Sequence, residues 1–354
     1  MRVVLVSAYF RPHVGGVERS VETLADGLAA RGHSVTVLCT RTERGSPLLE
    51  RGAYEVVRVP ATNVVERRLG VPYPLPAPLA LVPALRCELR GADVVHVHDV
   101  LYPTSIAALA VAPSLAPRVV LTLHVGFVPQ RAPWLERAER AAIALAGPLA
   151  RRAHAAASMN DAVARWASAT WGLDVAFAPA GLPAISATAD RDAFGLPADA
   201  PVALFVGRDV PKKGLDHFAA ARPEGWERVA VTDRVRPGLR TFRFMPPERL
   251  ATLLASVDAL VLPSVAEGLP MIVQEAMTLG LPVVTTLQPG YERYLDSGDV
   301  VEIEPDAHSI EAALDRLRAP EERRRLADRG RAVAAARFSL DAMLDAYEEL
   351  YRPW

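Results

Sequence analysis

The chain has 354 residues, of which 51% are hydrophobic and 23% are charged, so it is long enough for two globular domains. Its 40 basic and 41 acidic residues leave a formal net charge of −1, which provides no long-range attraction to nucleic acid. Two cysteines, Cys39 and Cys87, are too few for a disulfide framework, and no apolar run is long enough for a signal peptide or a membrane span. We therefore expect a cytoplasmic protein that binds no nucleic acid.

Short runs of β-branched residues alternate with longer helical patterns along the first half of the chain. The first helix has a clear period, because Val17, Val21, Leu24 and Leu28 share one face. Such alternation is typical of βαβ units, and continuous apolar strands are typical of a parallel sheet covered on both faces. We predict an α/β, Rossmann-like domain over residues 1–176, with strands at 3–7, 35–39, 55–59, 94–98, 119–124 and near Ala155.

A stretch rich in Pro, Gly and Ala then interrupts the pattern, and we predict that residues 177–197 connect two domains. A second alternating series predicts another Rossmann-like domain over residues 198–337, with strands at 202–206, 228–231, 241–244, 259–262 and 283–286. Residues 338–354 are helical and are expected to pack back on the first domain. Because such folds bind ligands at the carboxyl ends of their strands, the expected site is a cleft between the two domains.

The segment SVAEGLPMIVQEAM carries the strongest chemical pattern, since a strand ends before it and a helix begins within it. The N–H groups of Met271, Ile272 and Val273 are expected to point out of the helix start and to form an anion site for a diphosphate. Glu275, one turn further on, is placed to accept both hydroxyls of a ribose, and Glu267 is placed to reach hydroxyls beyond the phosphates. Alternatively, Glu267 is an ordinary charged residue of the loop, and Glu275 interacts only with the helix dipole.

The segment LFVGRDVPKKGLD places Arg208 and Lys213 just after the strand predicted at 202–206. Two cations at a strand end suit a diphosphate leaving group, because they would stabilise its departing negative charge. Lys212 and Lys213 are the only lysines in an arginine-rich chain, so this pair stands out. A pair of solvated loop lysines is the alternative.

The segment AYFRPHVGGVERS follows the first strand, and its Gly15 and Gly16 would let the backbone approach a ligand closely. The helix that starts beside them again offers free N–H groups. The segment lacks the GxGxxG fingerprint, and no acidic residue closes the second strand, which disfavours a nicotinamide oxidoreductase. A plain strand-to-helix turn is the alternative.

Three histidines lie at or near predicted strand ends. His96 and His98 alternate along one strand, and His124 ends the next one. His124 is the stronger functional candidate because of its place at a strand end beside the expected cleft, whereas core packing is the favoured interpretation of His96 and His98. No further ligand lies at metal-site spacing, so we expect no bound metal.

Together these segments resemble the family 4 retaining glycosyltransferases of the GT-B fold, and the resemblance covers nearly the whole chain. AYFRPHVGGVERS, VVHVHD, LTLHVGF, FVGRDVPKKGLD and EGLPMIVQEAM occur in the family's order. The resemblance implies that Arg208 and Lys213 bind the donor diphosphate and that Glu267 binds the transferred sugar. It also implies that Glu275 binds the ribose, that Gly16 lies against the phosphates, and that His124 lies near the transferred sugar. By the same resemblance, the domain over residues 1–176 would bind the acceptor and the domain over residues 198–337 would bind the nucleotide sugar.

The resemblance further implies transfer from a nucleoside diphosphate sugar, with UDP or GDP as the expected nucleotide, without a metal or other cofactor. The configuration of the transferred sugar would be retained by front-face displacement, in which the departing diphosphate assists the acceptor hydroxyl. A retaining hydrolase would instead need two carboxyl groups about 5 Å apart, and the spacing shows no such pair. Thr232 and Asp233 occupy the position where the family usually has a glycine-containing strand end that helps to hold the nucleotide base. The identity of the base is therefore not indicated by the sequence.

A saccharide or lipid-linked acceptor is expected, with a small natural-product aglycone as the alternative. A GT-B-like nucleotide-sugar epimerase and a non-catalytic sugar-nucleotide-binding protein also stay open, and an NAD-binding module is the weakest alternative. Residues 67–86 are proline-rich and apolar, and residues 131–152 form a basic amphipathic helix suited to anionic lipid at the inner face of the membrane. Packing within the domain is the commoner explanation for both segments.

Overall fold

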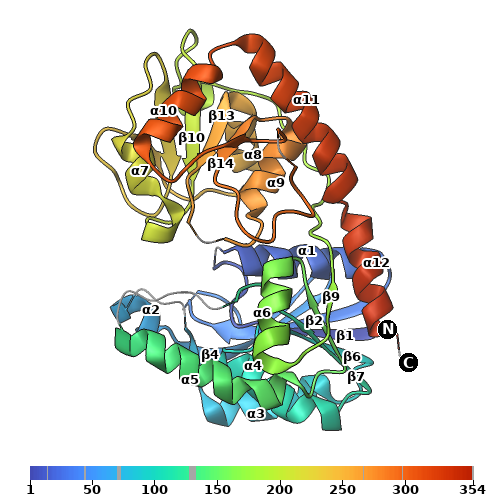
Figure 1. Ribbon diagram of the computed structural model, residues 1–354. Helices are drawn as coiled ribbons and strands as arrows, with labels where there is room; N and C mark the ends of the chain where they lie inside the picture. The colour runs from blue at the N-terminus through green and yellow to red at the C-terminus, as the bar shows by residue number, and fades with distance from the viewer. Residues whose placement is uncertain are drawn as a thin grey trace. The chain divides into compact units, whose positions relative to one another are not determined.

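A computed structural model describes residues 1–13, 15–43, 45–69, 73–126, 133–265, 267–296 and 298–352, and the chain divides into two compact α/β units (Figure 1). Unit 1 comprises Met1–Gly181 together with Leu340–Trp354, and unit 2 comprises Leu182–Ser339. The segment expected to connect two domains is therefore divided between the units, with residues 177–181 in unit 1 and residues 182–197 in unit 2.

Unit 1 is built on a sheet with the strand order β3-β4-β2-β1-β6-β7-β8-β9, and β5 pairs with β4. The strands are β1 (Arg2–Val6), β2 (Ser34–Arg41), β3 (Leu49–Arg51), β4 (Glu55–Thr62), β5 (Leu75–Pro76), β6 (Val94–His98), β7 (Arg118–Thr122), β8 (Ala155–Ser158) and β9 (Val175–Phe177). All described pairs are parallel except those that β3 and β5 make with β4. Because β1 lies between β2 and β6, the order of the strands reverses between β1 and β6, which makes this gap the switch point of the sheet.

Helices cover both faces of this sheet, as the burial of alternate residues of β1 in two different cores shows. Val3 and Leu5 are buried in one core with residues of the first and last helices, whereas Val4 and Val6 are buried in a second core on the opposite face. The helices of unit 1 are α1 (Gly16–Ala30), α2 (Val64–Leu69), α3 (Pro78–Leu89), α4 (Pro103–Val111), α5 (Pro133–Ala150), α6 (Asp161–Trp171) and α12 (Leu340–Tyr351), with a 3₁₀ turn at Ala112–Ser114. Continuous apolar strands are therefore required here, since both of their faces are buried.

The C-terminal helix α12 belongs to unit 1 and lies beside α1 (Figure 1). Leu344 and Tyr347 of α12 share a core with Leu28 of α1. Gly27 permits the close approach, because a Cβ atom there would lie 2.8 Å from both terminal methyl carbons of Leu344. The last turn is tied to the sheet as well, since the hydroxyl of Tyr351 lies 2.8 Å from Nδ1 of a buried histidine on β6.

Unit 2 is built on a wholly parallel sheet with the order β12-β11-β10-β13-β14-β15. Its strands are β10 (Val202–Val206), β11 (Glu227–Val231), β12 (Arg240–Phe242), β13 (Ala259–Leu262), β14 (Val283–Thr285) and β15 (Val301–Glu302). Its helices are α7 (Leu215–Ala220), α8 (Pro247–Ser256), α9 (Met271–Leu279), α10 (Ala307–Arg316) and α11 (Pro320–Arg337), with 3₁₀ turns at Asp192–Phe194 and Pro211–Lys213. The switch point of this sheet lies between β10 and β13.

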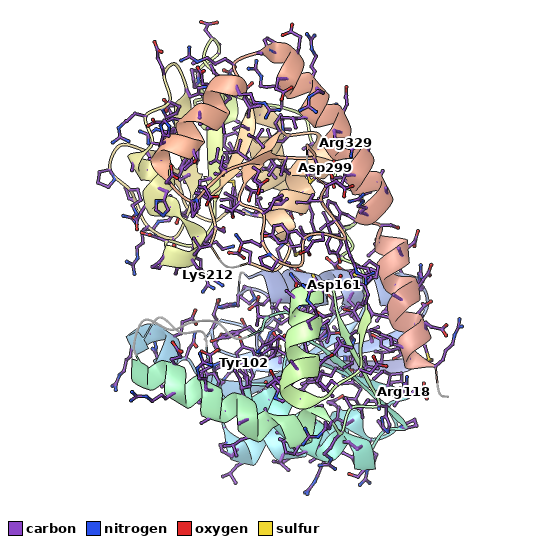
Figure 2. The ribbon with its side chains drawn as sticks, in the orientation of Figure 1. Tyr102, Arg118, Asp161, Lys212, Asp299 and Arg329 are labelled. Atoms are coloured by element: carbon purple, nitrogen blue, oxygen red, sulfur yellow. The ribbon has the colours of Figure 1, made fainter. Side chains whose placement is uncertain are left out.

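The long helix α11 packs against α9 and is also held by an ion pair between a half-exposed arginine and a buried aspartate. The side chain of Asp299, just before β15, is fully buried, and its carboxylate accepts a hydrogen bond from Nε of Arg329 at 2.5 Å. Figure 2 shows these two side chains facing each other within unit 2. A buried carboxylate needs such a partner, because an unpaired charge there would be costly.

The segments at residues 67–86 and 131–152 contribute to the second core of unit 1. Leu81 and Leu85 of α3 and Ile143 of α5 are buried in it, whereas Leu79 of α3 is 94% exposed and Leu145 of α5 is 78% exposed. Residues 70–72, 131 and 132 of these segments lie outside the described residues. Among the helices that the structure describes, none combines the length and the hydropathy needed to span a membrane.

The structure confirms an α/β fold of two Rossmann-like units with parallel sheets. Every strand predicted from the sequence is present, and its bounds agree within three residues. Four strands were missed, namely β3, β5, β9 and β15, because runs of two or three residues are too short to show a period. The strand predicted at 119–124 ends at Thr122, so His124 lies in the loop that follows it.

We expect Gly27→Ala to lower the free energy of unfolding by about 1–3 kcal/mol, because the added methyl group overpacks the contact with Leu344. Leu344→Ala alone should cost about 2–5 kcal/mol as a cavity, and the double variant should cost clearly less than the sum of the two. Urea unfolding measures all three. Gly330→Ala in α11 is the control, since a Cβ atom there has its nearest contact at 3.5 Å. Additive costs for the pair would contradict the packing account.

Candidate functional site

Two loops of unit 2 meet at the switch point of its sheet, one after β10 and one between β13 and α9. Gly214 makes the approach possible, because it has a φ of +72° and a Cβ atom there would lie 2.0 Å from the carbonyl oxygen of Pro263. The N–H of Val265 donates to the carbonyl oxygen of Lys212 at 2.8 Å. The two sequence patterns that carry Arg208, Lys213 and the paired glutamates are therefore brought together in the fold.

Lys213 and Glu267 form an ion pair where these loops meet. Lys213 Nζ lies 2.8 Å from Glu267 Oε1, and their side chains are 19% and 11% exposed. The stem of Lys213 passes close to Gly207, where a Cβ atom would lie 3.5 Å from Lys213 Cδ. The sequence predicted a separate role for each of these residues, and the contact between them is a finding of the structure.

Further positive charge gathers beside this pair. The guanidinium of Arg208 forms no ion pair with any residue in the described part of the chain, and Asp209 next to it is already bound by Arg236 at 2.5 Å. Burial lowers the pKa of Lys212, which is labelled in Figure 2; the Glu267 carboxylate opposes this shift, and the cations of Lys213 and Arg208 add to it. This end of β10 therefore has the charge needed to bind phosphate.

The helix α9 begins beside the same cluster, with Pro270 as its N-cap residue. The N–H of Val273 donates to the carbonyl oxygen of Pro270 at 3.0 Å, so the expectation that this N–H is free for an anion is not met. The reason is that the first turn closes tightly on the proline carbonyl. Across the described ranges, the N–H groups of Met271 and Ile272 have no acceptor. Glu275 lies one turn further on and is only 3% exposed.

Three buried polar side chains near the ion pair were missed by the sequence analysis. Within the described residues, Ser264 Oγ and Gln274 Oε1 are buried without a hydrogen-bond partner. Tyr291, in the loop after β14, is buried, and burial together with the charge of Glu267 raises the pKa of the phenol. Ser264 had a usable signal, because it is a short polar residue at the end of an apolar strand, whereas nothing in the spacing indicates Tyr291.

In unit 1 the two candidate glycines differ in their surroundings. A Cβ atom at Gly15, the N-cap residue of α1, would lie 2.1 Å from Oε2 of Glu18, so this carboxylate folds back over the helix start. A Cβ atom at Gly16 would have nothing within 4 Å. The positive end of the helix dipole is therefore matched by the protein's own carboxylate, and of the two only Gly16 stays open to a ligand.

The three candidate histidines are buried, with His96 within β6, His98 at its end and His124 in the loop after β7. His98 Nδ1 lies 3.0 Å from His124 Nε2, and burial lowers the pKa of both rings. His96 bonds to Tyr351 and Thr122, and burial lowers its pKa to about 3. His96 therefore links the sheet to α12, whereas His98 and His124 contact each other at the sheet edge.

Asp99, between β6 and α4, is a further residue of interest at this edge. It is the one non-glycine residue with a positive φ, +56°, in the described part of the chain, and it is 5% exposed. Its Oδ1 accepts a hydrogen bond from the backbone N–H of His124 at 2.8 Å. Nothing in the spacing indicates this backbone conformation, which is uncommon for a residue other than glycine, although Asp adopts it more readily than most.

Over the ranges that the structure describes, no group of three or more His, Cys, Asp and Glu side chains is placed to hold a metal ion. The residues that the structure brings together thus form two sets. One set of cations, carboxylates and free N–H groups belongs to unit 2, and one set of histidines, carboxylates and an open glycine belongs to unit 1.

Comparison of the whole chain with known proteins shows the family to which it belongs. The model described as Glycosyltransferase Family 4 matches residues 14–181, and the model described as Glycosyl transferases group 1 matches residues 234–333. The chain is 31% identical over 326 residues to a GDP-mannose-dependent alpha-mannosyltransferase of Mycolicibacterium smegmatis, and the match covers 80% of this chain and 79% of the relative.

Solved structures support the same fold. Sucrose-phosphate synthase from Thermosynechococcus elongatus matches with a TM-score of 0.81 and 20% identity over 99% of this chain and 98% of that one. HepE of Anabaena, solved in complex with UDP and glucose, matches with a TM-score of 0.77 and 16% identity over 98% of each chain. The chain is a glycosyltransferase, and it belongs to the family 4 glycosyltransferases of the GT-B fold.

Proposed function

We propose that the chain transfers a sugar from a nucleoside diphosphate sugar to a hydroxyl group of a saccharide or lipid-linked acceptor. The transfer retains the anomeric configuration and uses neither a metal ion nor another cofactor. The main support for a nucleoside diphosphate sugar as donor is the cluster of Arg208, Lys213 and Glu267 at the switch point of unit 2. Parallel sheets bind nucleotides at this position, and the cluster supplies the charge that a diphosphate requires.

In this proposal Arg208 and Lys213 hold the diphosphate. Arg208 provides a planar fork of donors with no competing carboxylate among the described residues, and Lys213 provides a compact charge. The free N–H groups of Met271 and Ile272 add two further donors at the positive end of α9. All of these groups are in place before the reaction, so they stabilise the leaving diphosphate without a large rearrangement.

The two glutamates recognise hydroxyl groups on either side of the diphosphate. Glu267 lies in the loop before α9 and binds the transferred sugar, and its contact with Lys213 holds the carboxylate in position when no donor is bound. Glu275, buried one turn into α9, accepts hydrogen bonds from the ribose. The donor-side roles that the family resemblance assigns to Gly16 and His124 of unit 1 stay predictions.

The reaction follows from this arrangement without a nucleophile from the protein. The bond between the anomeric carbon and the diphosphate oxygen breaks as the acceptor oxygen bonds to the same face of the sugar. The departing diphosphate oxygen takes the proton of the acceptor hydroxyl. The rate then depends on how well Arg208, Lys213 and α9 stabilise the negative charge that develops on that oxygen.

UDP or GDP is the proposed donor nucleotide. GDP is supported by the printed name of the mannosyltransferase relative, and UDP is supported by the ligand in the HepE structure. A small natural-product aglycone is the alternative acceptor. Contact of α5 with an anionic membrane also stays a prediction, supported by the exposed Leu145 and open to a test by co-sedimentation with vesicles.

We expect Arg208→Ala and Lys213→Ala each to lower turnover by about 10²–10³-fold, because each removes a group that stabilises the leaving diphosphate. Release of UDP or GDP from the matching sugar donor, with an acceptor present, measures this. Arg324→Ala is the matched control, since Arg324 is a largely exposed residue of α11, and its turnover should equal that of the wild type. Near wild-type turnover of both variants would refute the assignment.

The stereochemical part of the proposal has its own test. Proton NMR of the initial product should show the same anomeric configuration as the donor, and the rate should be unchanged after treatment with EDTA. An inverted product would exclude front-face displacement, and loss of activity in EDTA that added divalent cation restores would exclude a metal-independent mechanism.

A further inference from the structure

The loop after β11, residues 232–239, lies beside the loop that carries the cations of unit 2. Because β10 and β11 pair in parallel, the loops that follow them begin side by side. The N–H of Gly207, the first residue after β10, donates to the carbonyl oxygen of Val231 at 3.0 Å. Two charged side chains of the loop after β11, Asp233 and Arg236, form hydrogen bonds with the loop after β10. Neither residue belongs to the donor site proposed above.

Asp233 holds the backbone at the start of the cation-bearing loop. Its Oδ1 accepts hydrogen bonds from the backbone N–H of Asp209 at 2.6 Å and from Oγ1 of Thr232 at 3.2 Å. Thr232 is buried, and its N–H donates to the carbonyl oxygen of Phe242 at 3.0 Å. The residue that follows Arg208 is therefore fixed to the end of β11 by a carboxylate that the sheet supports.

Arg236 binds both ends of the segment that contains the two lysines. Its Nη2 donates to Asp209 Oδ1 at 2.5 Å and to Asp216 Oδ1 at 2.8 Å. Asp209 precedes the 3₁₀ turn that contains Lys212 and Lys213, and Asp216 lies in the first turn of α7 after it. One guanidinium thus holds a carboxylate on each side of the lysine pair.

The two carboxylates differ in their access to water. The side chain of Asp209 is 11% exposed, whereas that of Asp216 is 71% exposed. Water stabilises the charge of Asp216, but the charge of Asp209 needs a partner, because a carboxylate with little access to water is costly when it is unpaired. In the described part of the chain, Arg236 is the one cation that forms an ion pair with Asp209.

If Arg236 were removed, the cations of the donor site would be the alternative partners of Asp209. Asp209 is next to Arg208 in the sequence, so their Cα atoms are about 3.8 Å apart. Arg208 forms no ion pair within the described residues, so its guanidinium is available to a released carboxylate. Lys213 already shares its charge with Glu267, and the site therefore depends strongly on a free Arg208. A pair between Asp209 and Arg208 would remove a charge that the diphosphate requires.

We propose that Arg236 is a positioning residue of the donor site, which engages the Asp209 carboxylate and so leaves the Arg208 guanidinium free for the diphosphate. The inference rests on the donor site proposed above and adds a residue of the neighbouring loop to its electrostatic support. Arg236 acts through Asp209 and does not contact the donor. Loss of the Arg236 charge therefore weakens phosphate binding, whereas loss of the Asp209 charge in the same chain removes the competitor.

Calorimetric titration of the full chain with UDP and GDP tests the inference. Arg236→Ala and, independently, Arg236→Gln should weaken binding of the preferred diphosphate about tenfold, which is the size of one charge-assisted hydrogen bond. Arg236→Lys keeps a cation beside Asp209 and should retain most of the affinity. Two neutral variants are used so that a failure of one to fold leaves the other as the test.

Two double variants separate this role from a purely structural one. Arg236→Ala with Asp209→Asn should recover the wild-type affinity, because an amide has no charge with which to neutralise Arg208. Arg236→Ala with Asp216→Asn is the matched control, and it should stay as weak as Arg236→Ala alone. It neutralises the other carboxylate of the same guanidinium, which water already stabilises.

Arg240→Ala is a second control, because it breaks an ion pair with Glu227 at the opposite ends of β11 and β12. It should bind the diphosphate as the wild type does. Unchanged affinity in both neutral Arg236 variants would overturn the inference and leave the donor site intact. The inference would also be wrong if Asp209→Asn failed to restore binding, or if Asp216→Asn restored it equally well. No binding of either nucleotide by the wild type would refute the donor site and this inference together.

Discussion

The proposed chemistry of this chain depends on an ammonium group and a carboxylate held 2.8 Å apart at the switch point of unit 2. The contact between Lys213 and Glu267 exists because Gly214 lets the loop after β10 approach the end of β13 without a side chain in between. Any other residue at position 214 would collide with the carbonyl of Pro263 and would also be strained at a φ of +72°. The backbone therefore fixes the distance between the cation proposed to bind phosphate and the carboxylate proposed to bind the sugar, as contact with one donor molecule at two points would require.

The two units use the same position of a parallel sheet for opposite charges. In unit 2 the edge between β10 and β13 gathers Arg208, Lys212 and Lys213 beside an open helix start, which suits an anion. In unit 1 the edge between β1 and β6 gathers carboxylates, and Glu18 covers its own helix start.

Much of the fold follows from the sequence, because strand periods, helix faces and strand-end positions are all local properties. The strands at 94–98, 202–206 and 259–262 were predicted to the residue. Arg208 and Lys213 were predicted after a strand end, and Glu267 was predicted in the loop before a helix. The pairing of Lys213 with Glu267, the return of Glu18 over Gly15 and the contact of His98 with His124 were not predicted. Spacing shows which edge of a sheet a residue occupies, but side-chain partners depend on how separate loops pack. The positive φ of Asp99 is a tertiary effect for the same reason.

The central claim is that the edge of unit 2 between β10 and β13 binds the diphosphate of a nucleotide, and calorimetric titration tests it most directly. UDP, GDP, UMP and GMP would be titrated into the full chain at two salt concentrations. The account predicts one-to-one binding of UDP or GDP, tighter than that of the matching monophosphate, and weaker at high salt because the contacts are ionic. Equal affinity for diphosphate and monophosphate, or no heat with any of the four nucleotides, would contradict it.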